Sequence, residues 1–139
     1  MKGMKKALRF WLPPILWAVV IFSFSSLPTV KASQFFWKDF LIKKSAHVLE
    51  YAIFTVLLYR ALRAYGMTKK DAAVSSIFVA LLYGISDEIH QTFTPGREPR
   101  VRDVIFDTIG SLLAVFSLWK LLPKAPKKLK KWARKLHLA

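Results

Sequence analysis

Four apolar runs divide the chain, over about residues 10–27, 46–62, 72–91 and 101–122. A helix needs about 20 predominantly apolar residues to cross the hydrocarbon core of a bilayer. Pro28 and Pro123 follow the first and last runs and would end a helix there. The pattern therefore predicts an all-α fold, an integral membrane bundle of four helices.

The connections between these runs carry the polar and turn-forming residues. Residues 29–44 contain the segment FFWKDFLIKK, and aromatic rings alternating with lysines are favoured in the headgroup layer. We expect a short interfacial segment there, or a loop against the bundle. Between the third and fourth runs, Pro95 and Gly96 have the order of a type II turn.

Residues 123–139 form a basic tail after a four-helix domain, residues 1–122. Leu129, Trp132, Ala133 and Leu136 fall at i, i+3, i+4 and i+7, so a helix here would carry one apolar stripe among lysines and arginines. This predicts an amphipathic helix at the membrane interface that binds anionic lipids of the inner leaflet. A disordered polybasic tail would supply the same attraction without the helix.

Composition agrees with a membrane protein. Hydrophobic residues make up 54% of the 139 residues, which is too apolar for an ordinary soluble domain of this size. The formal net charge is +15, but the cations lie between the apolar runs and at the termini rather than over one groove-facing surface, so no nucleic-acid partner is expected. With no cysteine, the chain has neither disulfides nor a thiolate metal site.

The distribution of cations predicts the orientation. Of the 23 lysines and arginines, 16 lie within residues 1–10, 60–70 and 120–139, and 7 lie in the other two connections. By the positive-inside rule both termini are then cytoplasmic. The connection between the third and fourth helices faces outward.

Ionisable residues gather at the outward ends of three of these helices. On the second helix, His47, Glu50 and Tyr51 share one face. On the third and fourth helices the polar faces continue into small residues, which let membrane helices approach closely. These two faces are Ala80, Gly84, Asp87 and Gln91, and Asp103, Asp107, Gly110 and Ala114. Because intramembrane ionisable groups are usually functional, the convergence predicts a polar pocket open to the outer leaflet.

Other interpretations of the same residues remain open. Lys44, His47 and nearby arginines could neutralise the acids, so that buried ion pairs would only fix how the helices pack. Acid and base catalysis could use a histidine with a carboxylate, with Ser25 or Ser26 as a nucleophile, although no G-x-S-x-G motif is present. The candidate catalytic residues are His47, Asp87, Glu88 and Asp103. No metal is expected, because no ligand pair has H-E-x-x-H or similar spacing.

Three motifs together resemble the VanZ-like family of small bacterial membrane proteins. They are FSFSSLP at residues 22–28, KSAHVLEYAIFTVLL at 44–58 and DEIHQTFTPGREPRVRDVIFDTIGSLLA at 87–114. The resemblance extends from about Trp11 to Trp119. It implies a four-helix protein of the bacterial cytoplasmic membrane and a contribution to teicoplanin resistance, and it leaves any biochemical activity open.

The resemblance also implies which residues form the site. The positions that match are Lys44, His47, Tyr51, Asp87, Glu88, Gln91, Arg97, Asp103 and Gly110. Asp107 departs from the family pattern, which usually has Asn there, so a possible anion replaces a neutral donor. Protonation of Asp107 or pairing with Arg102 would neutralise it.

We therefore expect an outward pocket that binds or modifies a cell-envelope component, either a lipid-linked cell-wall precursor or a glycopeptide. Lys44 and Arg97 would recognise its anionic groups. The expected ligand-binding set is Lys44, His47, Glu50, Tyr51, Asp87, Glu88, Gln91, Arg97, Asp103 and Asp107. No cofactor is expected. A membrane enzyme acting on a lipid-linked substrate and a structural subunit or scaffold of a membrane complex are the alternatives, and the oligomeric state is left open.

Overall fold

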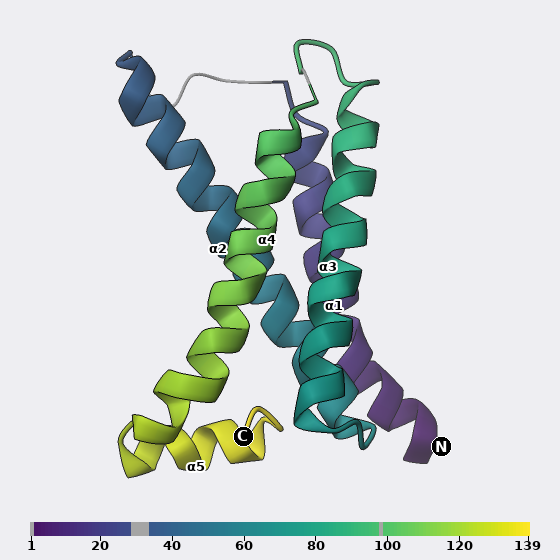
Figure 1. Cartoon of the computed structure of the whole chain (residues 1–139). Helices are drawn as coiled ribbons and strands as arrows, with labels where there is room; N and C mark the ends of the chain where they lie inside the picture. The colour runs from purple at the N-terminus through teal and green to yellow at the C-terminus, as the bar shows by residue number, and fades with distance from the viewer. Residues whose placement is uncertain (1, 29–33, 98) are drawn as a thin grey trace.

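The computed structural model describes residues 2–28, 34–97 and 99–139, and helices make up most of these ranges (Figure 1). Four long helices form a bundle: α1 (Lys2–Ser25), α2 (Phe36–Ala64), α3 (Lys69–Gln91) and α4 (Val101–Phe116). α4 continues into the π-helical η1 (Ser117–Leu121) and the 3-10 turn η2 (Leu122–Lys124), and α5 (Lys127–Lys135) follows. The predicted all-α bundle is confirmed.

Three helical segments are long and apolar enough to cross a membrane: Gly3–Ser25, Lys69–Gln91 and Val101–Lys124. At 1.5 Å per residue each extends about 35 Å, against a hydrocarbon core about 30 Å thick. α2 is the longest helix, at 29 residues, but it is the most polar of the four because it carries several lysines and two acids. It crosses the bundle obliquely beside α4, and its first turns diverge from the other helices (Figure 1).

The burial pattern of α3 is the reverse of that in a soluble protein. Its inward face consists of small and polar residues, including Ala80, Gly84 and Asp87. Large apolar residues lie on its outer face, where Phe78 and Ile89 are more than half exposed. A helix that exposes its apolar residues is at low free energy only in an apolar solvent. The outer surface of the bundle is therefore suited to contact with lipid.

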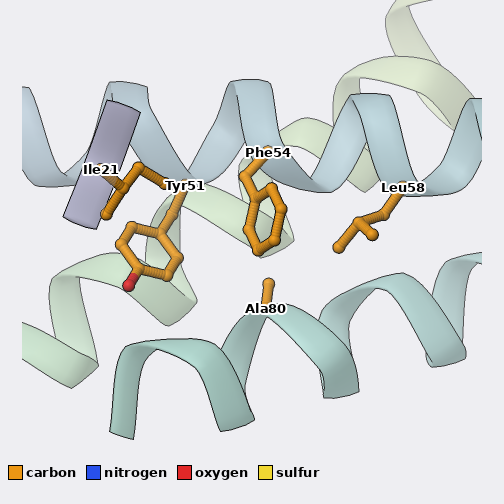
Figure 2. Packing of buried hydrophobic residues seen from close by; sticks show 5 residues of the cluster. All are labelled: Ile21, Tyr51, Phe54, Leu58 and Ala80. Atoms are coloured by element: carbon orange, nitrogen blue, oxygen red, sulfur yellow. The ribbon is translucent and has the colours of Figure 1, made fainter. Parts of the chain in front are cut away.

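The bundle core lies between α1, α2 and α3. Ile21, Tyr51, Phe54, Leu58 and Ala80 form one buried cluster in which the small Ala80 lies opposite the Phe54 ring (Figure 2). This arrangement follows the usual rule for membrane helices, in which a small residue on one helix admits a large side chain from its neighbour.

The start of α2 corrects one expectation. Helix was expected from about residue 46, with an interfacial segment or loop before it, but α2 begins at Phe36. Residues 34–64 contain no proline or glycine that would stop a helix. In the first turns, Lys43 and Asp39 form an i,i+4 ion pair at 2.9 Å, and Asp39 lies near the positive end of the helix dipole. Residues 29–33 of this connection lie outside the described ranges.

The connection between α3 and α4 contains the turn that the sequence predicts. The Arg97 backbone N–H donates to the Thr94 carbonyl oxygen at 3.1 Å, and Gly96 has φ +77°. A type II turn requires this positive φ at its third residue. The turn leads the chain directly from α3 into α4.

Both chain ends lie at one end of the bundle, and the turn after α3 lies at the other (Figure 1). α5 runs across the bundle axis at the end that holds the termini. The Leu138 N–H donates to the Ala133 carbonyl at 2.9 Å, and His137 takes a left-handed conformation, so α5 ends in a Schellman motif. Leu138 then packs against the bundle. The predicted amphipathic C-terminal helix is present, with Leu129 and Trp132 exposed along its stripe.

Candidate functional site

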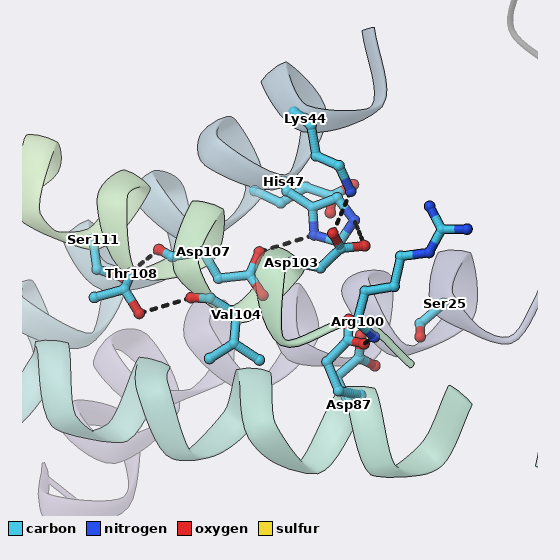
Figure 3. Close-up of polar contacts among 12 residues, drawn as sticks. Ser25, Lys44, His47, Asp87, Arg100, Asp103, Val104, Asp107, Thr108 and Ser111 are labelled. Atoms are coloured by element: carbon cyan, nitrogen blue, oxygen red, sulfur yellow. Dashed lines mark hydrogen bonds and ion pairs between the residues drawn. The ribbon is translucent and has the colours of Figure 1, made fainter. Parts of the chain in front are cut away.

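Polar side chains from three helices meet near the middle of α2, in the first turns of α4 and at the end of α3, and we call this group the polar cluster (Figure 3). Its members are buried or half-buried among the helices. They are Lys44, His47, Glu50, Tyr51, Asp87, Glu88, Gln91, Asp103 and Asp107. The periodicity of the sequence predicted this convergence.

Two side-chain pairs connect α2 to α4. Lys44 Nζ forms an ion pair with Asp103 Oδ1, and both residues are about nine-tenths buried. One turn deeper, His47 Nδ1 lies 2.9 Å from Asp107 Oδ1 (Figure 3). His47 Nε2 is also 3.9 Å from Asp103 Oδ2, so this ring bridges the two acids of α4. Both carboxylates of α4 therefore have a side-chain partner on α2.

The α3 side is organised by hydrogen bonds rather than ion pairs. Gln91 Nε2 donates to Asp87 Oδ2 at 3.1 Å and to Ser25 Oγ at 3.0 Å, which joins α3 to the end of α1. Glu88 Oε2 accepts the backbone N–H of Arg100 at 2.6 Å, immediately before α4 begins. One oxygen of the Asp87 carboxylate and one of the Glu88 carboxylate therefore already have a hydrogen-bond donor within the protein.

The second oxygens of these carboxylates have no partner. Asp87 Oδ1, Glu88 Oε1 and the Tyr51 hydroxyl are buried and make no hydrogen bond within the described part of the chain. An unsatisfied buried polar atom typically costs about 1–3 kcal/mol. The cluster also has five carboxylates but only Lys44 and His47 as cations. It consequently has a surplus of buried acceptors that need hydrogen-bond donors.

The family model described as VanZ/LLP1 matches residues 10–122, which is most of the chain. The chain belongs to the VanZ/LLP1 family. It is a membrane protein, and the predicted resemblance is confirmed. No curated protein and no solved structure matches it.

The VanZ-matching region contains most of α1, all of α2 to α4 and their polar cluster, whereas α5 lies beyond it. Two arginines expected near the acids have other partners. Arg97 donates from Nε to the Leu27 carbonyl at 3.0 Å and from Nη2 to the Phe24 carbonyl at 2.9 Å. The Arg102 guanidinium lies 4.9 Å from the centre of the Phe40 ring. Asp107, the departure from the VanZ pattern, pairs with His47 instead.

Two polar residues below the cluster were missed by the sequence analysis. The Thr55 hydroxyl donates to Ser111 Oγ at 2.8 Å, and Ser111 in turn donates to the Asp107 carbonyl at 3.1 Å. Both residues are fully buried. The available signal was their spacing, because Thr55 follows Tyr51 by four residues and Ser111 follows Asp107 by four.

The two serines considered as nucleophiles have separate surroundings. Ser25 accepts from Gln91 at the edge of the polar cluster, whereas Ser26 Oγ lies 3.1 Å from His90 Nε2. His90 also packs against Phe22, on the side of α3 that faces α1, with the two ring centroids 4.4 Å apart. The described residues contain no group of three or more metal-ligating side chains arranged to hold a metal ion.

Proposed function

We propose that this VanZ-family protein binds an amphipathic cell-envelope component at the polar cluster and so contributes to glycopeptide (teicoplanin) resistance. The observation that carries this proposal is the set of unpartnered buried acceptors on Asp87 and Glu88. A ligand that brings hydroxyl or ammonium donors would satisfy them, with each bond to a charged acceptor contributing about 1.5–3 kcal/mol. Sugars of a lipid-linked cell-wall precursor or of a glycopeptide have donors of this kind.

The proposal places the protein in the bacterial cytoplasmic membrane with the cluster on the outer side. Most lysines and arginines belong to the terminal segments, to the last turns of α2 and to the start of α3, which lie at the opposite end of the bundle (Figure 1). This supports cytoplasmic termini through the positive-inside rule. The exposed cations and apolar stripe of α5 support contact with anionic inner-leaflet lipids.

Neutralising the unpaired carboxylates tests the proposal. Asp87→Asn and Glu88→Gln keep the side-chain shape but weaken the acceptor that meets the ligand. We expect each variant to bind fluorescent teicoplanin, or a purified lipid-linked cell-wall precursor, about tenfold more weakly in phospholipid nanodiscs. The free energy of unfolding should stay the same or rise, because each variant removes a buried charge that has no ion-pair partner among the described residues.

The matched control is Ser86→Ala, which alters an exposed polar residue on the same turn of α3. It should leave binding unchanged. If Asp87→Asn and Glu88→Gln bind both probes as tightly as the parent protein, or lose binding only together with folding, the cluster has a structural role instead. Release of a cleaved product from the lipid-linked probe, lost in His47→Ala, would favour the enzyme alternative.

A further inference from the structure

We propose that the apolar groove between α2 and α4 holds the hydrocarbon chain of a long-chain isoprenoid phosphate, with the phosphate at Arg102. This inference rests on the proposed function, because it names the lipid part of the molecule that the polar cluster would bind. The groove adjoins the cluster through Lys44, which lines both.

The groove is a hollow of about 400 Å³ on the surface of the bundle. Its walls are almost entirely apolar: Phe40, Val48 and Leu49 line it from α2, and Phe106 and Leu113 line it from α4. A second hollow of about 250 Å³ shares Ala52, Ala114 and Ser117 with the first and continues it towards η1. The two hollows form one path along the seam between α2 and α4, which could accommodate a flexible hydrocarbon chain.

The upper end of this path is lined by aromatic rings and cations. The Phe40 and Phe106 rings meet edge to face at 6.1 Å, and Lys44 Nζ lies 5.8 Å from the centre of each. Lys44 is already paired with Asp103. Arg102, however, is exposed and forms no ion pair with any carboxylate in the described ranges. Its guanidinium over Phe40 is therefore the cation available to an anionic headgroup, and phosphate is well matched to it.

The length of the path distinguishes between lipids. From Phe40 to Leu57, α2 advances about 26 Å at 1.5 Å per residue. One leaflet is half of a hydrocarbon core that is about 30 Å thick, so a phospholipid whose acyl chains stay within their own leaflet would cover only about 15 Å of this path. A chain that fills the whole path must be longer than this. A polyprenyl chain on a single phosphate has both the length and the charge.

The chain-length dependence of binding tests this inference without any variant. In phosphatidylcholine nanodiscs, a polyprenyl phosphate long enough to cross both leaflets should bind at least about tenfold more tightly than geranyl phosphate, because the longer chain makes more van der Waals contacts with the walls of the groove. A photoreactive form should label the α2 and α4 walls of the groove. Phosphatidylglycerol should compete poorly. Equal binding of the short and long chains, equal competition by phosphatidylglycerol, or labelling spread evenly over the outer faces of all helices would overturn the proposal.

Two variants locate the chain and the phosphate separately. Ala52→Leu adds volume where the two hollows meet, and Arg102→Gln removes the free cation; each should weaken binding of the long-chain phosphate about tenfold. Val74→Leu, on the exposed face of α3, is the matched control for added apolar volume and should have no effect. If Asp87→Asn weakens binding of the sugar-bearing probes while Ala52→Leu and Arg102→Gln leave the polyprenyl phosphate unaffected, the groove inference fails and the proposed function stands. Crosslinking of the groove walls to a second copy, in place of the lipid, would also overturn the inference.

Discussion

Replacing Lys44 by methionine is expected to lower the free energy of unfolding by about 3–5 kcal/mol. The substitution keeps a long flexible side chain but leaves the Asp103 carboxylate buried without its ion-pair partner. His47 Nε2, at 3.9 Å, is too far away to replace the lost lysine by a direct hydrogen bond. The loss can be measured by steric trapping of the protein in bicelles.

The double variant Lys44→Met with Asp103→Leu is the control for this prediction. It removes both charges, and replacing a buried ion pair by apolar residues of similar volume is often neutral or stabilising. The double variant should therefore recover most of the loss seen in Lys44→Met. If the effects of the two single substitutions simply add, or if Lys44→Met costs less than about 1 kcal/mol, as exposed ion pairs do, then the pair does not hold α2 against α4.

Gly110→Ala is expected to destabilise the protein by about 1–3 kcal/mol, as other overpacking substitutions do. A Cβ atom at this position would overlap the Val48 carbonyl oxygen and would lie 2.9 Å from its carbon. These are backbone atoms, so the two helices must separate to admit a methyl group. The separation would also disturb the His47 and Asp107 pair one turn above. Reversible unfolding in mixed micelles would measure the cost.

Gly3→Ala is the matched control, because a Cβ added there meets nothing within 4 Å. Alanine is favoured over glycine inside a helix by up to about 1 kcal/mol, so Gly3→Ala should be neutral or slightly stabilising. If Gly110→Ala behaves in the same way as Gly3→Ala, then the close contact between α2 and α4 is not required for the fold.

The helices and their inward faces could be predicted from sequence because both depend on local spacing. Asp87 and Gln91 on α3, and Asp103 and Asp107 on α4, are four residues apart, which places each pair on one side of its helix. The start of α2 was predicted too late. The lysines in its first turns, Lys38, Lys43 and Lys44, lower the local hydropathy although the backbone there is helical. Hydropathy locates the apolar part of a helix and not its ends.

The side-chain partners could not be predicted in the same way. Which cation meets which carboxylate depends on the relative height and rotation of two packed helices, and the sequence of one helix does not specify either. Pairing with Arg102 was one of the ways in which Asp107 was expected to be neutralised, but the packing of α2 against α4 brings His47 to it instead. Arg97 was likewise expected at the site, and the fold places it against the end of α1.

Cysteine accessibility measures the orientation on which the proposed function depends, and the chain has no cysteine of its own. Phe93→Cys, exposed in the turn after α3, and Lys69→Cys, exposed at the start of α3, report the two ends of the bundle. In intact bacterial cells, a membrane-impermeant maleimide should label Phe93→Cys and should reach Lys69→Cys only after the membrane is opened. Labelling of Lys69→Cys in intact cells, with Phe93→Cys protected, would place the polar cluster on the cytoplasmic side and contradict an outward-facing envelope-binding site.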